Sequence, residues 1–320
     1  MADAEDFSTL KERAKRKLER DMGPLLLGAL NDPRTVEIML NADGRLWQER
    51  LGEKMQCIGA LRVAQSEAII KTIAGYHGKE ITRGKPVLEG ELPLDGSRFA
   101  GQLPPIVPAP TFAIRKRAVA IFALAQYVAA GIMSEAQHAA LQAAVRNHKN
   151  ILVIGGTGSG KTTLVNAIIH EMVVCDPTER VFIIEDTGEI QCAAENFVQF
   201  HTSMDVPMTA LLKTTLRMRP DRILVGEVRG AEALDLLDAW NTGHEGGAAT
   251  LHANNAAAGL ARLRSLITRN EAAPAEIEAL IAEAVHVVVH IARTPDGGRR
   301  VHEILGVLGY ADGRYITQGL

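Results

Sequence analysis

The chain has 320 residues, of which 47% are hydrophobic, 23% charged and only 4% aromatic, and its formal net charge is −3. This length and hydrophobic fraction allow two compact domains and exclude a largely disordered chain. The slight negative charge argues against a protein that binds nucleic acid over a broad surface, because such proteins normally carry an excess of basic residues.

The cysteine and apolar patterns indicate in which cellular compartment the protein is expected. Cys57, Cys175 and Cys192 are well separated and form no CxxC pair, so neither a disulfide framework nor a four-cysteine zinc site is expected. No run of eighteen apolar residues occurs, and the acidic start MADAEDFSTL is unlike a signal peptide. We therefore expect a cytoplasmic protein whose contact with a membrane is peripheral or goes through partners.

Residues 1–21 are predicted to form a charged helix. Leu10, Ala14 and Leu18 recur at helical spacing within a segment that is otherwise rich in lysine, arginine and glutamate. A solvated surface helix is the simpler interpretation. Docking of this helix on acidic lipid or on a membrane partner is the alternative.

Residues 22–112 are predicted to form a small α+β domain. The pattern indicates a hairpin over 35–50 around an Asp-Gly turn, a helix over 64–74, and short strands with turns over 81–114. The proline-rich stretch QLPPIVPAPT (102–111) is predicted to be the joint to the next domain, because proline stiffens a connection and does not allow a helix through it.

Residues 113–320 show the alternation of an α/β domain. Short apolar runs are separated by helical stretches, which is typical of a mostly parallel sheet with both faces covered. A final helix pair is followed by two strands around an Asp-Gly-Gly turn. The predicted strands of the sheet are Ile151–Ile154, Val181–Ile184, Ile223–Val225, Ala248–Leu251, Val285–Ile291 and Arg300–Leu308.

A complete phosphate-binding loop, G-x-x-x-x-G-K-[ST], lies between a predicted strand and a predicted helix. Its glycines allow the tight turn in which backbone N–H groups point inward at a polyphosphate. Lys161 is expected to reach the β- and γ-phosphates of ATP, and the Thr162 hydroxyl is expected to bind Mg²⁺. The predicted nucleotide-binding residues of the loop are Gly155, Gly156, Thr157, Gly158, Ser159, Gly160, Lys161, Thr162 and Thr163.

Acidic residues and histidines follow neighbouring predicted strands. Glu185 and Asp186 come at the end of one strand and Glu227 follows the next, at the sheet edge where open α/β sheets bind ligands. Such carboxylates could contact the metal or orient water, or they could merely cap loops and pair with nearby arginines. His252 follows a further strand and is a catalytic candidate; His244 is a weaker one, since a lone histidine is more often a packed residue.

The motifs GGTGSGKTT, IIEDTGEIQ, LRMRPDRILVGEVRG and TGHEGGAATLHAN together resemble those of the secretion ATPases of type II and type IV systems. The segment LDGSRFAGQLPPIVPAPTFAIRK extends the likeness into the first domain, and the chain as a whole is similar to the conjugal-transfer branch of the family. The resemblance implies a RecA-like P-loop ATPase domain preceded by the smaller α+β domain. By the same resemblance Glu185 is the Asp-box glutamate and Glu227 the Walker B glutamate.

The resemblance also assigns arginines and a metal contact. Arg98 and Arg115 match the first-domain arginines that reach towards bound nucleotide, and Arg217 and Arg219 are weaker candidates for charge contacts near the site. The Walker B segment lacks the usual aspartate, so Glu227 is expected to contact Mg²⁺ directly or through water.

The implied function is that of a hexameric ATP-hydrolysing motor at the cytoplasmic face of a conjugative type IV secretion channel, serving pilus biogenesis or substrate transfer. Its partners would be further copies of itself and inner-membrane components of the apparatus, with no stable binding of nucleic acid. The alternatives are a pilus-retraction ATPase, a RecA-like nucleic-acid-handling ATPase, and a scaffold that binds nucleotide without hydrolysing it.

Overall fold

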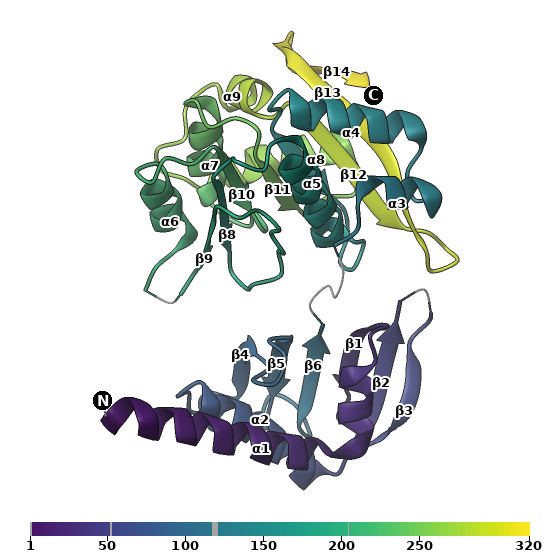
Figure 1. The fold of residues 1–320 in the computed structure, drawn as a ribbon, viewed down its shortest axis with the longest axis vertical. Coiled ribbons are helices and arrows are strands. Elements are labelled where there is room, and N and C mark those ends of the chain that lie inside the picture. The colour runs from purple at the N-terminus through teal and green to yellow at the C-terminus, as the bar shows by residue number, and fades with distance from the viewer. Residues whose placement is uncertain (1, 52, 117–120, 204) are drawn as a thin grey trace. The chain divides into compact units, whose positions relative to one another are not determined.

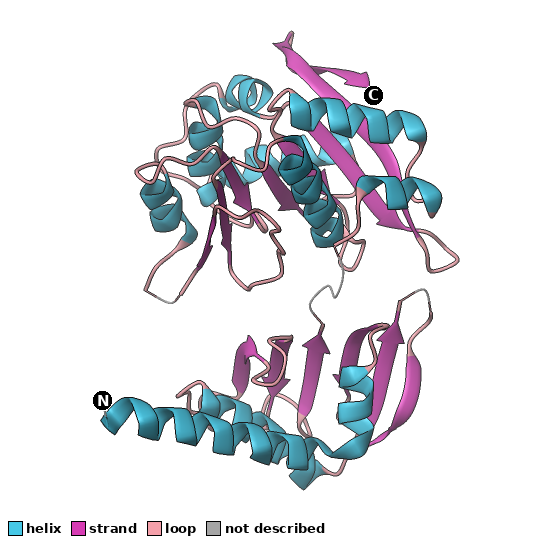
Figure 2. Cartoon of the chain, in the orientation of Figure 1, coloured by secondary structure: helices cyan, strands magenta, loops and turns pink. Residues whose placement is uncertain are grey.

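The computed structural model describes residues 2–51, 53–116, 121–203 and 205–320, with side chains from Thr9 onward. The chain divides into two compact units, residues 1–119 and 120–320 (Figures 1 and 2). The division lies beyond the predicted boundary at 112/113, because strand β6 (Thr111–Arg115) belongs to the sheet of the first unit.

The sheet of the first unit is antiparallel in every pairing, in the order β3-β2-β1-β6-β5-β4 (Figure 1). The predicted hairpin over 35–50 is present as β1 and β2. The proline-rich stretch is not the joint between the units: it connects β5 to β6, which pair with each other so that Gln102 lies opposite Thr111. Proline ends both strands, but the chain returns to the same sheet. The bounds are β1 Thr35–Leu40, β2 Arg45–Arg50, β3 Gln56–Ala60, β4 Val87–Glu91 and β5 Arg98–Gln102.

Two helices cover this sheet, α1 (Ala2–Asn31) and α2 (Val63–Tyr76). The helix predicted over 1–21 does not stop there: the helical segment continues to Asn31 across a kink at Gly23, whose φ is 66°. Leu18, at 0% exposure, lies in the same apolar cluster as strand and α2 side chains, whereas Leu10 is 53% exposed. The C-terminal part of the predicted charged helix is therefore part of the core of the first unit.

The sheet of the second unit has the order β14-β13-β12-β7-β11-β10-β8-β9 (Figure 1). The strands from β12 to β9 run parallel, and β13 and β14 add an antiparallel hairpin at one edge. The bounds are β7 Ile151–Ile154, β8 Val181–Glu185, β9 Phe197–His201, β10 Arg222–Val225, β11 Ala248–Leu251, β12 Val287–Arg293, β13 Arg299–Ala311 and β14 Arg314–Gly319.

Helices cover both faces of this sheet (Figure 2). Because side chains alternate along a strand, Ile151 and Val153 of β7 enter the apolar cluster with α3, α4 and α5, while Leu152 and Ile154 enter the cluster with α6 to α9. Strands buried on both faces read as continuous apolar runs. The bounds are α3 Leu124–Ala129, α4 Glu135–Arg146, α5 Lys161–Cys175, α6 Met208–Thr215, α7 Glu232–Asn241, α8 Ala256–Ile267 and α9 Ile277–Ala284.

The parallel order determines which loops meet at one edge. In the row β7-β11-β10-β8, the segments that follow the carboxyl ends are the glycine-rich loop, His252, Gly226-Glu227 and the end of β8 at Glu185. Motifs about a hundred residues apart in sequence are thereby neighbours. Within the described residues, no helix is long and apolar enough to cross a membrane.

Candidate active site

The glycine-rich loop joins the end of β7 to the first turn of α5, the context that a phosphate loop requires. Gly158 (φ 66°) and Gly160 (φ 96°) are in the left-handed region that disfavours other residues. A Cβ on Gly155 would lie 2.1 Å from the carbonyl oxygen of Ile291 on β12. By contrast, a Cβ on Gly156 would meet no atom within 4 Å.

Lys161 opens helix α5 and is mostly buried at the loop. Its Nζ donates to the carbonyl oxygens of Gly155 (3.0 Å) and Gly156 (2.9 Å). The same Nζ lies 3.4 Å from Nδ1 of His252. The ammonium group is thus held inside the curve of the loop, next to the histidine that follows β11.

Two hydroxyl groups of the loop region differ in their partners. The Thr162 Oγ1 donates to Oε2 of Glu189 at 3.4 Å. Ser159 is 2% exposed, and among the described residues its Oγ has no hydrogen-bond partner. Such a buried hydroxyl is normally satisfied by some partner. Glu189 did not figure among the predicted site residues, although it lies in the same acidic motif as Glu185.

Glu227 is the centre of a charged cluster at the end of β10. Its Oε2 accepts from Nη2 of Arg229 at 2.6 Å and its Oε1 lies 3.1 Å from Nε2 of His252. Arg229 also contacts Oδ2 of Asp186 at 3.1 Å. Burial raises the pKa of Glu227, but the bond and charge of Arg229, with His252 and Lys161, outweigh it and lower the pKa overall. This carboxylate therefore stays charged at neutral pH.

Glu185, the last residue of β8, is in a different environment. It is 3% exposed, and its two oxygens accept hydrogen bonds from the Ile190 N–H (3.0 Å) and the Gln199 amide (2.8 Å). Burial raises its pKa to about 7, against the opposing effect of these hydrogen bonds. A Cβ on Gly226 would lie 2.7 Å from the Cβ of Glu185, so only glycine lets β10 continue past this carboxylate.

Some predicted residues lie at the other edge of the sheet. His244 precedes β11, and Arg217 and Arg219 precede β10, so all are at the amino ends of parallel strands whose carboxyl ends face the loop. The sequence alone could not show that these three residues lie away from the phosphate loop. Each belongs to a motif that also contains a residue at the carboxyl ends of the strands, His252 or Glu227.

Arg98 and Arg115 lie in the first unit. They are directly opposite each other on β5 and β6, so both side chains are on the same face of that sheet. Glu91 is opposite Arg98 and Glu37 is opposite Arg115, which places the two guanidinium groups in a row flanked by carboxylates.

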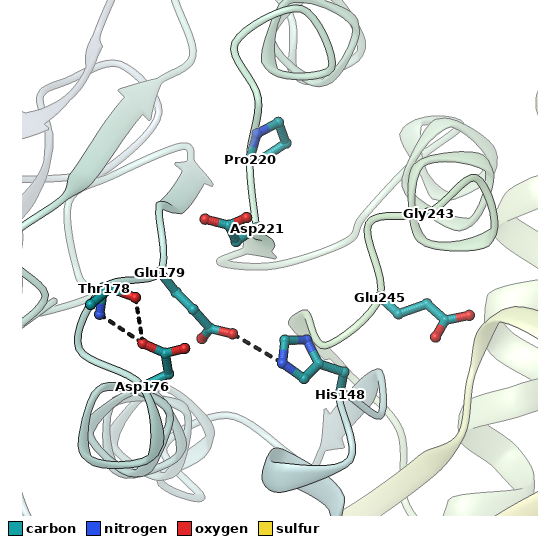
Figure 3. A pocket seen from close by; sticks show the side chains of 8 residues that line it. All are labelled: His148, Asp176, Thr178, Glu179, Pro220, Asp221, Gly243 and Glu245. Carbon is teal, nitrogen blue, oxygen red and sulfur yellow. Dashed lines mark hydrogen bonds and ion pairs between the residues drawn. The ribbon is translucent and has the colours of Figure 1, made fainter.

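A cavity of about 520 Å³ lies at the amino ends of β8, β10 and β11 (Figure 3). Its lining is acidic, with Asp176, Glu179, Asp221 and Glu245 beside His148. Figure 3 shows Glu179 and His148 pointing towards each other, with the carboxylate 3.0 Å from Nε2 of the histidine. An acidic lining repels phosphate, so this cavity is not a candidate for the nucleotide.

Comparison with known proteins decides the family. The family model described as "Type II/IV secretion system protein" matches residues 96–304. The chain belongs to this family. A conjugal transfer protein TrbB of Rhizobium radiobacter is 49% identical over 306 residues, which cover 96% of this chain and 94% of that protein. The predicted resemblance to conjugal-transfer proteins of the family is thereby confirmed.

Solved structures share the fold at lower identity. The ATPase DotB of Legionella pneumophila matches with a TM-score of 0.62 at 21% identity, over 86% of this chain and 77% of that one. The pilus retraction motor PilT, solved with bound ADP, matches with a TM-score of 0.61 at 20% identity, over 87% and 80%. The α/β fold class is the same in all of them.

Proposed function

We propose that this chain is a Mg²⁺-dependent ATPase with a RecA-like second domain, which converts ATP and water to ADP and phosphate. The observation that carries the proposal is the phosphate loop with Lys161 inside its curve, next to the Glu227–His252 pair. Membership of the secretion ATPase family supports it. A non-hydrolysing scaffold would not need two carboxylates at this edge with such different environments.

The loop residues fit a nucleotide. The positive φ angles of Gly158 and Gly160 suit a turn whose N–H groups converge on phosphate. The buried Ser159 hydroxyl, which has no partner among the described residues, could hydrogen-bond to the nucleotide. Residues Gly155 to Thr163 would hold the phosphates, with Lys161 on the β- and γ-phosphates. The Thr162 hydroxyl and the Glu227 carboxylate would hold Mg²⁺, which supplies charge neutralisation of the phosphates when bound.

The two glutamates divide the chemistry. A carboxylate whose pKa is near 7 can accept a proton from water at neutral pH, which suits Glu185 as the residue that orients and polarises the attacking water. Glu227 stays ionised, which suits contact with a cation. His252 lies between Lys161 and Glu227 and is the third candidate for contact with the γ-phosphate or the metal-bound water.

We also propose that Arg98 and Arg115 sense the γ-phosphate. A guanidinium group binds two phosphate oxygens at once, and the two arginines share one sheet face. Contacts made to ATP and not to ADP would give the closed state the differential affinity that a motor needs.

The motor itself is proposed as a homohexameric ring at the cytoplasmic side of a conjugative type IV secretion apparatus, where it powers pilus biogenesis or substrate transfer with inner-membrane partners. Near-complete coverage of a conjugal transfer protein at 49% identity supports this role over that of a pilus-retraction motor. A mass measurement by light scattering with an ATP analogue tests the ring.

The experiment for the chemical roles uses Glu185→Gln and Glu227→Gln. Each amide keeps the shape of the carboxylate and loses its charge and basicity, so both variants should bind ATP and release phosphate at least about a hundredfold more slowly than the wild type. Radiolabelled ATP retention and phosphate release measure the two steps. Normal turnover by both variants would remove the catalytic assignment.

A further inference from the structure

The β12–β13 hairpin lies alongside the phosphate loop. Strand β12 pairs in parallel with β7, with His290 opposite Ile154, the last residue of β7. Because β12 continues to Arg293, its last residues run beside the loop that follows β7. The side chains at the end of the hairpin contact the same glycines that the loop requires.

One hydrogen bond and two close approaches to glycine define this arrangement. The Nε of Arg293 donates to the carbonyl oxygen of Gly158 at 3.0 Å. A Cβ on Gly158 would lie 2.5 Å from Nη2 of Arg293, and a Cβ on Gly160 would lie 3.0 Å from Cδ of Arg299. Arg293 and Arg299 are themselves opposite each other on β12 and β13. The loop is thus flanked by two arginine side chains that none of the loop, Asp-box, Walker B or His-box motifs contains.

The bond to Gly158 fixes the orientation of one peptide group. In a trans peptide the C=O and the following N–H point in opposite directions, so a Gly158 carbonyl held towards the hairpin directs the Ser159 N–H away from it. In the structure this N–H points across the loop to the carbonyl of Gly156 at 3.4 Å. A long bond of this kind is easily exchanged for a stronger one to a charged oxygen.

We propose that Arg293 is a positioning residue of the active site: through its Nε bond to Gly158 it keeps the Ser159 N–H directed into the loop, where a phosphate oxygen of the nucleotide accepts it. This inference rests on the proposed ATPase function. Glycine at 158 has little conformational preference of its own, so without the arginine this peptide can rotate. Because the N–H binds phosphate in both the ground state and the transition state, its loss raises KM more than it lowers kcat.

Three variants at position 293 separate the bond from the charge. Glutamine places an amide nitrogen at the same distance along the side chain as the Nε of arginine, and methionine places a methyl group there. Lysine keeps the charge but extends one atom further. Arg300→Gln is the matched control, because Arg300 is exposed on the same hairpin and points to the opposite face of β13 from Arg299.

The measurements are KM and kcat for ATP, with thermal unfolding to show that every variant folds. We expect Arg293→Met to raise KM about tenfold, a typical effect of losing one charged hydrogen bond. Arg293→Gln should stay within about threefold of the wild type, and Arg300→Gln should be unchanged. Hydrogen exchange in the loop peptide should be faster in Arg293→Met than in Arg293→Gln.

The proposal is overturned if the KM of Arg293→Gln is as high as that of Arg293→Met, whatever the KM of Arg293→Lys. The hydrogen bond from position 293 to Gly158 would then not determine nucleotide binding. Failure of the underlying function looks different. In that case the wild-type protein would show no turnover that depends on Lys161, and no variant at position 293 could be ranked.

Discussion

Glu185 and Glu227 are the same residue type at the carboxyl ends of neighbouring strands, and their surroundings push their pKa values in opposite directions. Burial in β8 raises the pKa of Glu185 to about 7, whereas Arg229 and the nearby histidine and lysine lower the pKa of Glu227. Pairs of titratable groups separated in this way are typical of an acid–base site. The proposed division of roles between them thus rests on their different local environments.

The raised pKa of Glu185 predicts a pH-dependent stability. In the unfolded chain a glutamate has its ordinary pKa of 4.5, so between about pH 4.5 and 7 the folded chain holds a proton that the unfolded chain has released. The free energy of unfolding therefore falls as pH rises through this window, by roughly 3 kcal/mol at most. Urea unfolding of the wild type and of Glu185→Gln, which cannot titrate, should diverge steadily as the pH rises from 4.5 to 7.

Glu227→Gln is the control for this measurement. Because the folded pKa of Glu227 is lowered, its contribution is complete above the unfolded value and is lost only in more acidic solution. Between pH 5 and 8 the Glu227 carboxylate stays charged, so its own titration should add no slope to the difference from the wild type. A flat difference for Glu185→Gln over the same range would contradict the raised pKa.

Among the elements, β10 begins with a fully buried arginine. Arg222 is 1% exposed, and its guanidinium bonds Glu179, the carbonyl of Gly246 (2.9 Å) and the carbonyl of Val145 (3.3 Å). These bonds connect the start of β10 to the segments before β8 and β11 and to the end of α4. Arg222 is therefore a structural link at the amino ends of the strands, away from the acidic residues that follow the carboxyl ends of β8 and β10.

Removal of Glu179 should therefore be costly. Glu179→Ala leaves the Arg222 charge buried without its carboxylate, and the free energy of unfolding should fall by about 3–5 kcal/mol. Glu245→Ala, on the same acidic cavity but at an exposed residue, should change it by less than about 0.5 kcal/mol. Denaturant unfolding compares the two; a loss from Glu179→Ala no larger than that from Glu245→Ala would show that the ion pair is dispensable.

The sequence could predict the strands that are buried on both faces, because each of them is a continuous run of apolar residues. Strands β7 and β11 occupy the predicted residues, and β8 and β10 differ by one residue at one end. Both faces of each strand are covered, and glycine or polar residues bound each apolar run. Less buried elements were missed, among them the edge strand β9, which is half exposed, and helix α4, which is alanine-rich and whose buried side chains are confined to Leu141, Ala144 and Val145. The alanines of α4 occupy exposed and buried positions alike, so they do not identify its buried face.

The residues of the candidate site also differ in how far the sequence could predict them. Lys161, Glu185, Glu227 and His252 could be found because their motifs follow strands in a known order. Pairing of the carboxylates with nearby arginines was an alternative that the sequence left open, and Arg229 does contact Glu227 and Asp186. The contacts of Glu189 and Arg293 could not be predicted, because they depend on which segments are neighbours in space and on side-chain direction. The proline-rich stretch misled for a related reason: proline ends a strand without indicating whether the chain returns to the same sheet.

For the molecule as a whole, the similarity to conjugal transfer proteins extends over both units. The family match begins at residue 96, in the first unit, and ends at residue 304, and the alignment with the Rhizobium radiobacter protein covers 96% of the chain. A ring of identical subunits needs a heterologous contact that closes. The proposed motor further requires that Arg98 and Arg115 of the first unit respond to the nucleotide bound by the second.

Steady-state phosphate release by Lys161→Ala tests the central claim most directly. Lys149→Ala is the matched control, since Lys149 lies just before β7 and Lys161 just after the loop that follows it, and each variant removes one positive charge. If Lys161 stabilises charge on the transferred phosphoryl group, its loss should reduce turnover to less than about a tenth of the wild type and abolish DNA transfer in a complementation assay, while Lys149→Ala remains close to the wild type. Turnover by Lys161→Ala above a tenth of the wild-type rate would contradict the account.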